Sequence, residues 1–235
     1  MQSLDVLSPS RPMDCRAIVL QSVALTPTIK SIRLRLDQPE FRFLPGQSIW
    51  PRFQRDGKTF SKIYSISSSP HTCPEIELCV SRVGWSSAYL QDLQVGEAIA
   101  ARGPYGLMTL GRLPNRPRLY IAEGSGIAPL KSQIDWLYDC RFSHPVWLVQ
   151  SNPETPDQLP YCDYWRSLQA VWPQFQYVEA IDCGPERWLM QRRLDLDRFD
   201  VEICGVGKRV AQLQDIVLGL GAIAEQVRSE TFYAF

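Results

Sequence analysis

The distribution of apolar residues changes once along this chain of 235 residues, near Pro114. Before this point, short segments alternate apolar and polar side chains, as residues 32–36 do. After it, short apolar runs alternate with longer stretches of helical character. A period of two is typical of half-buried antiparallel strands, whereas alternating strands and helices favour a parallel sheet. The sequence therefore predicts two domains of different architecture.

The first half is expected to form a six-stranded antiparallel Greek-key β-barrel with one helix. The predicted strands are residues 15–25, 32–36, 47–53, 60–66, 76–82 and 97–102, and the predicted helix is 86–93. Turn signals such as Pro45-Gly46 and Asp56-Gly57 separate the strands.

The second half is expected to form a Rossmann-like parallel sheet with helices on both faces. Its predicted strands are 118–122, 146–150, 176–180 and 201–204, and its predicted helices are 129–140, 161–171 and 209–220. The boundary is placed at the Gly- and Pro-containing connection 111–117. We thus expect an N-terminal tail (1–12), a barrel domain (13–112) and an α/β domain (117–235).

Composition narrows the possible partners. A hydrophobic fraction of 45% with 21% charged residues is that of a folded globular protein. The formal net charge of zero gives no electrostatic reason to expect binding to nucleic acid or to an anionic membrane. The chain has no recognisable signal peptide or membrane-spanning run, so a cytoplasmic location without membrane insertion is expected. None of the seven cysteines is spaced like a zinc or iron–sulfur ligand set, so no metal is expected.

A glycine-containing loop follows the predicted strand 118–122 and precedes a predicted helix. It reads Gly124, Ser125, Gly126, Ile127, Ala128 and Pro129. Backbone N–H groups at such a junction can bind a pyrophosphate, and Pro129 suits a first helical turn. The usual dinucleotide fingerprint has a third glycine there, and its next strand is followed by an acid, whereas this one ends at Asn152. A plain tight turn is the alternative.

Two polar motifs in the first half could hold a flavin. The first ends a predicted strand and the second begins the predicted helix, and their residues are Lys62, Ile63, Tyr64 and Ser65, then Gly84, Trp85, Ser86 and Ser87. A tyrosine ring could pack along an isoalloxazine, and the start of a helix could bind a phosphate. The alternatives are an ordinary surface strand and a serine-capped helix.

The order of these motifs resembles that of the ferredoxin–NADP reductase superfamily over nearly the whole chain. The family pattern Arg-x-Tyr-Ser/Thr corresponds to the motif beginning at Lys62, and the pattern Gly-x-x-Ser/Thr to Gly84 and Ser87. The glycine loop and the late pair Cys204-Gly205 follow in the same order.

The resemblance implies a flavoprotein that transfers a hydride from NADH or NADPH to flavin N5 and passes electrons to an acceptor. It implies FAD rather than FMN. The implied flavin-binding residues are Lys62, Ile63, Tyr64, Ser65, Gly84, Ser86 and Ser87. The implied nicotinamide-nucleotide residues are Gly124, Ser125, Gly126, Ile127, Pro129, Asn152, Cys204 and Gly205. The residues placed at the reacting rings are Ser65, Cys204 and Phe232. Phe232 belongs to the aromatic C-terminal segment 229–235, for which a last strand buried in the sheet is the alternative. For Cys204 the alternative is a buried cysteine at a strand end.

Two departures from the family pattern leave the function open. Lys62 replaces an arginine, which exchanges a bidentate fork for a point charge. Glu123 replaces a glycine and brings a carboxylate to an anion site, which disfavours a pyrophosphate unless the carboxylate points away. We expect a reductase that serves a protein acceptor such as a ferredoxin or an oxygenase component. The alternatives are a free-flavin reductase and a degenerate nucleotide-binding regulatory module. Asn152, where NADPH-selective relatives tend to have arginine, favours NADH.

Overall fold

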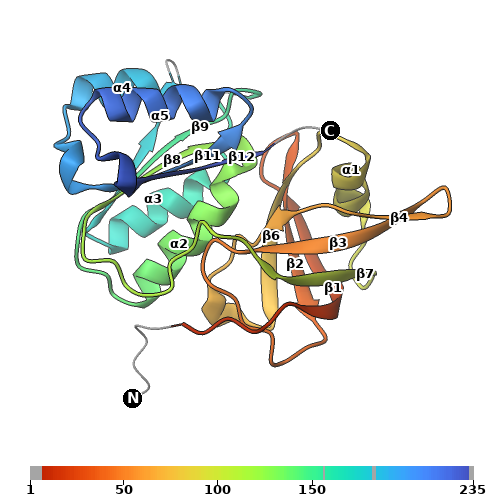
Figure 1. Cartoon of the computed structure of the whole chain (residues 1–235). Helices are drawn as coiled ribbons and strands as arrows, with labels where there is room; N and C mark the ends of the chain where they lie inside the picture. Colours follow the sequence, from red (N-terminus) through yellow and green to blue (C-terminus); the bar gives the residue numbers. More distant parts are fainter. Residues whose placement is uncertain (1–6, 156, 182–183, 233–235) are drawn as a thin grey trace.

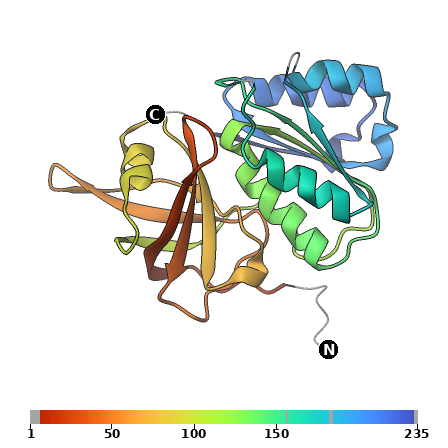
Figure 2. The same cartoon turned by 180° about the vertical axis from the view of Figure 1, so that it is seen from behind.

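A computed structural model describes residues 7–155, 157–181 and 184–232, which form two adjoining domains (Figure 1). Seen from behind, the barrel and the α/β domain again lie side by side (Figure 2). No helix in these ranges is both long enough and apolar enough to cross a membrane. In the segment before the barrel, the Leu7 N–H donates to the Gly111 carbonyl, and Ser10 bonds the backbone of Arg42.

The first domain is a seven-stranded antiparallel sheet with the order β4-β3-β7-β1-β2-β6, in which β5 pairs with β3. Its strands are β1 (Met13–Ala24), β2 (Ile29–Leu36), β3 (Ser48–Arg55), β4 (Lys58–Ser61), β5 (Tyr64–Ser65), β6 (Glu75–Ser81) and β7 (Ala98–Tyr105). A bridge between Ile66 and Leu78 joins the end of β5 to β6, so the sheet curls into a barrel. The helix α1 (Trp85–Asp92) lies over one end.

The period-two pattern is confirmed on β2. Ile32, Leu34 and Leu36 are buried in the barrel core. Arg33 and Arg35 are exposed between them and bond Glu75 of β6. One predicted strand differs: residues 60–66 divide into β4 and β5, and this division gives the sheet its seventh strand.

The second domain is a five-stranded sheet with the order β10-β9-β8-β11-β12, and all its pairs are parallel. Its strands are β8 (Arg118–Glu123), β9 (Val146–Ser151), β10 (Phe175–Glu179), β11 (Asp200–Val206) and β12 (Val227–Phe232). Its helices are α2 (Ile127–Asp139), α3 (Cys162–Val171), α4 (Gly184–Arg192) and α5 (Arg209–Gly219). Helices α2 and α3 cover the face towards the barrel, and α4 and α5 cover the other face (Figure 1).

The strand order reverses between β8 and β11, so the carboxyl ends of these two strands open a crevice that is a common ligand site in open α/β sheets. The crevice faces the barrel, because α2 begins there and packs against β6. One buried apolar cluster runs through the domain boundary and includes Ile29 and Cys79 of the barrel together with Ile127 and Ala128 of α2.

Candidate functional site

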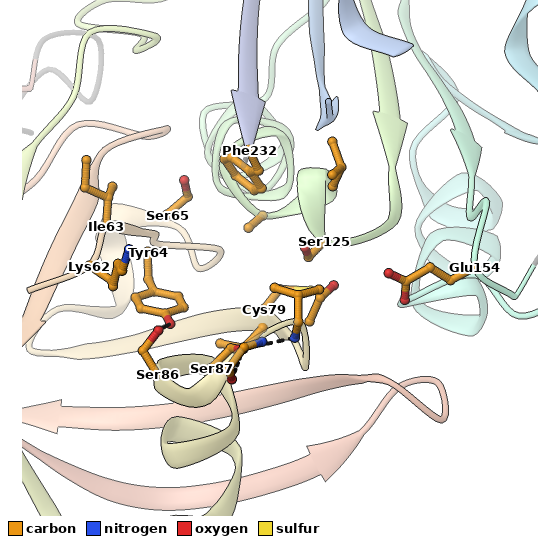
Figure 3. A pocket seen from close by; sticks show the side chains of 16 residues that line it. Lys62, Ile63, Tyr64, Ser65, Cys79, Ser86, Ser87, Ser125, Glu154 and Phe232 are labelled. Atoms are coloured by element: carbon orange, nitrogen blue, oxygen red, sulfur yellow. Dashed lines mark hydrogen bonds between the residues drawn. The ribbon is translucent and has the colours of Figure 1, made fainter. Parts of the chain in front are cut away.

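A cavity lies where the barrel meets the carboxyl edge of the parallel sheet (Figure 3). It is partly open, and its empty space amounts to about 820 Å³ when the adjoining solvent is included. The predicted site residues that line it are Lys62, Ile63, Tyr64, Ser65, Gly84, Ser86, Ser87, Ser125 and Phe232. The sequence motifs of both domains therefore converge on one space.

Tyr64 and Ser65 form β5 and enter the cavity from the barrel (Figure 3). The Tyr64 hydroxyl donates to Ser86 Oγ at 3.3 Å, which fixes the ring beside α1. Burial raises the pKa of Tyr64, so the phenol stays neutral at physiological pH. Ser65 is buried, and its Oγ lies 3.4 Å from Ser48 Oγ.

The connection between β4 and β5 places Lys62 and Ile63 at the cavity wall. Ile63 is 59% exposed, whereas Lys62 is half-buried. The ammonium group is the cation of the predicted flavin motif.

Ser87 acts as a cap at the start of α1. Its Oγ accepts the Val83 and Gly84 N–H groups at 3.0 Å each and donates to the Gly84 carbonyl at 2.9 Å. The alternative of a serine-capped helix is therefore present in the structure. It is compatible with phosphate binding, because Ser86, Ser87 and the first turn of α1 all border the cavity.

The glycine loop is a short 3-10 turn that leads directly into α2. Gly124 has φ +55°, a conformation that favours glycine. A Cβ on Gly126 would lie 2.4 Å from the Cys204 carbonyl oxygen, so glycine is required for the loop to touch β11. Ser125 faces the cavity, while Ile127 and Pro129 are buried in the first turn of α2.

Cys204 and Gly205 lie at the end of β11 but do not line the cavity. Cys204 is fully buried, and burial raises the pKa of its thiol well above the usual value. A neutral, enclosed thiol is not a nucleophile, so a positioning role at this strand end stays the prediction. Val206 and Phe232, at the ends of β11 and β12, form this part of the wall instead.

Glu123, the unexpected carboxylate, is 2% exposed and lies at the end of β8. Its Oε1 accepts Arg209 Nη2 at 3.0 Å, Arg209 Nε at 3.2 Å and Ser151 Oγ at 3.3 Å. Arg209 also pairs with Glu186 at 2.5 Å. Burial tends to lower the pKa of Arg209, but its bonds to both carboxylates outweigh this and raise the pKa. The carboxylate is thus directed towards α5 and paired with a cation.

Asn152 does not face the cavity. It is buried, and its amide donates to Thr155 Oγ1 at 2.7 Å and to the Gln158 carbonyl at 2.8 Å. Glu154, two residues later, lines the cavity (Figure 3) and accepts the Thr28 hydroxyl at 2.9 Å. Sequence reasoning missed Glu154, although an acid shortly after the second strand of such a sheet is a known signal for ribose binding.

Comparison with known proteins decides the family. A model of the Oxidoreductase FAD-binding domain matches residues 16–110, which include the barrel motifs. Ferredoxin–NADP reductase B of Sorangium cellulosum is 25% identical over 95% of this chain and 98% of its own length. The chain belongs to the ferredoxin–NADP reductase superfamily.

Two further likenesses support this superfamily and its fold. The phenol hydroxylase P5 protein of Acinetobacter pittii is 30% identical over 72% of this chain. The match spans 48% of that protein, about half its length. The FAD/NAD-binding domain of a nitric oxide dioxygenase from Vibrio cholerae has a TM-score of 0.82 at 19% identity and covers 93% of this chain and 98% of its own.

Superfamily membership confirms the predicted two-domain fold, the FAD cofactor and the enzyme class, an NAD(P)H-dependent flavoprotein oxidoreductase. The cavity fits such a cofactor pair. The barrel side of the cavity is bordered by the phenol of Tyr64, the ammonium of Lys62 and the start of α1. The other side is bordered by the glycine loop.

Proposed function

We propose that this member of the superfamily transfers a hydride from NADH to FAD and passes electrons to a separate redox protein. The cavity supports this, because the barrel motifs and Ser125 of the glycine loop border the same space. FAD, when bound, would accept the hydride and release electrons one at a time.

The residues of this chain have distinct parts in the proposal. Tyr64 would provide a flat wall for the isoalloxazine, and Ser65 a hydroxyl beside its reactive edge. Lys62 and the first turn of α1 would neutralise the FAD phosphates. The glycine loop would bind the nucleotide pyrophosphate at the start of α2. Phe232 and Val206 would exclude water from the ring contact.

A protein acceptor is proposed because the relatives are named for such systems, a phenol hydroxylase and a ferredoxin–NADP reductase.

Purified protein should hold FAD through gel filtration and lose its absorbance near 450 nm, roughly the usual flavin maximum, on anaerobic addition of NADH. FAD that separates from the protein on the column, combined with turnover of added flavin, would favour the free-flavin reductase. Flavin-loaded protein that neither NADH nor NADPH bleaches would favour the regulatory module.

The preference for NADH rests on Glu154 rather than on Asn152. A carboxylate after the second strand accepts ribose hydroxyl hydrogen bonds and repels the extra phosphate of NADPH. We therefore expect Glu154→Ser to improve kcat/KM for NADPH relative to NADH by about tenfold, roughly 1.4 kcal/mol. Steady-state kinetics with both nucleotides measures this ratio. Asn152→Ser is the matched comparison, and an effect confined to it would assign the selectivity to Asn152 instead.

A further inference from the structure

Lys131 of α2 reaches across the domain boundary into the barrel. Its Nζ lies 2.7 Å from Asp135 Oδ2 on the same helix and 3.3 Å from Glu77 Oε2 on β6. The Lys131 side chain is 9% exposed, and those of Asp135 and Glu77 are 13% and 15% exposed. One buried ammonium therefore joins a carboxylate of each domain.

A second bond runs parallel to this ion pair. Ser132 Oγ donates to the Ser68 carbonyl at 2.6 Å, and Ser132 is fully buried. Ser68 follows Ser65 of the flavin motif by three residues, and Lys131 follows Pro129 of the glycine loop by two. The first turns of α2 thus connect the flavin motif to the loop that would hold the nucleotide pyrophosphate.

Both members of the ion pair make further contacts with their surroundings. Glu77 Oε1 accepts the Tyr161 hydroxyl at 2.8 Å and also the Ser31 hydroxyl. The Lys131 ammonium lies 5.2 Å from the ring centre of Tyr161 and 5.0 Å from that of Tyr164. Burial by itself would lower the pKa of Lys131, but Asp135 and Glu77 outweigh it and keep the side chain charged.

We propose that Lys131 is a positioning residue that fixes the distance between nicotinamide and flavin through its ion pair with Glu77. The inference rests on the proposed function. Interfaces between domains of one chain ordinarily permit relative motion, whereas a buried pair with several bonds favours one geometry. Hydride transfer depends steeply on that geometry, since a misplacement of about 1 Å can cost about 100-fold in rate.

Two variants separate positioning from stability. Glu77→Gln removes the carboxylate that Lys131 pairs with in the barrel, whereas Asp135→Asn removes its partner within α2 and leaves the cross-domain pair intact. With the FAD-loaded protein, stopped flow would give the hydride-transfer rate at saturating NADH and the NADH dissociation constant. The long-wavelength nicotinamide–flavin charge-transfer absorbance and the melting temperature would be measured on the same samples.

We expect Glu77→Gln to slow hydride transfer by about tenfold and to weaken the charge-transfer absorbance, with the dissociation constant within about twofold of wild type. Asp135→Asn should keep the rate within about twofold, even where its melting temperature falls equally. Rates that follow melting temperature in both variants, or that change in neither, would overturn the proposal. If Glu77→Gln does not fold, the double variant Glu77→Gln/Lys131→Met, which removes both charges of the cross-domain pair, takes its place with the same expected result. Wild type that NADH fails to bleach would instead refute the proposed function.

Discussion

Gly126→Ala is expected to lower the rate of hydride transfer from NADH by about 100-fold, while FAD stays bound in the barrel. An alanine Cβ at this position would lie 2.4 Å from the Cys204 carbonyl oxygen and 2.7 Å from the Gly205 nitrogen. Both atoms belong to the backbone of a central strand, so neither can move aside cheaply. The glycine loop must therefore shift away from β11, and the pyrophosphate site shifts with it.

The measurement is anaerobic stopped flow with NADH, together with the FAD content after gel filtration. Gly219→Ala is the matched control, because Gly219 ends α5 in the same domain and its added Cβ would meet no described atom within 4 Å beyond its chain neighbours and the backbone of its own helix. The control should retain the wild-type rate. A Gly126→Ala protein with a normal rate would show that the loop does not position the nucleotide.

The sequence alone predicted the architecture because both domains follow simple apolar periods. The sequence-based prediction failed for segments whose structure depends on tertiary contacts. Residues 62 and 63 leave the sheet between β4 and β5 to form the cavity wall, and no period of two records such a break. Helix α4 was missed because it buries just Pro185 and Leu189 on its described side chains, so it lacks the apolar stripe that identifies a helix.

The candidate site was predicted residue by residue on the barrel side and less completely on the nucleotide side. Tyr64, Ser65 and Ser87 form short, contiguous motifs, so their neighbours in sequence are also neighbours in space. The nucleotide side depends on contacts between distant segments. Glu123 and Arg209 are 86 positions apart, and nothing in either local sequence indicates that they pair.

The pairing with Arg209 changes the expected effect of Glu123 on the pyrophosphate site. A carboxylate beside a pyrophosphate loop is unfavourable when it is unpaired, but Arg209 supplies the compensating charge from the start of α5. A basic residue in the first turn of a helix is itself unfavourable to the helix dipole. Glu123 beside the glycine loop and Arg209 at the start of α5 are each unfavourable alone. Each is tolerated because the other supplies the opposite charge.

Arg209→Met should accordingly destabilise the protein by about 3 kcal/mol, because it leaves a buried carboxylate without its cation. Ser151 would remain as a partner of Glu123 Oε1, while Glu123 Oε2 already has no hydrogen-bond partner within the described ranges. The unpaired carboxylate should also repel the nucleotide pyrophosphate and raise KM for NADH by about tenfold or more. Urea unfolding and steady-state kinetics measure the two effects.

The double variant Glu123→Gln/Arg209→Met tests whether the uncompensated charge of Glu123 causes these losses. It removes both charges and keeps a group that Ser151 can bond. It should recover most of the lost stability and of the affinity for NADH, as expected when both members of a buried pair are replaced. Arg187→Met, on the exposed surface of α4, should stay within about 0.5 kcal/mol of wild type. If the double variant is as unstable as Arg209→Met, the stabilisation comes from packing of the arginine stem, and the charge of Glu123 is not what Arg209 compensates.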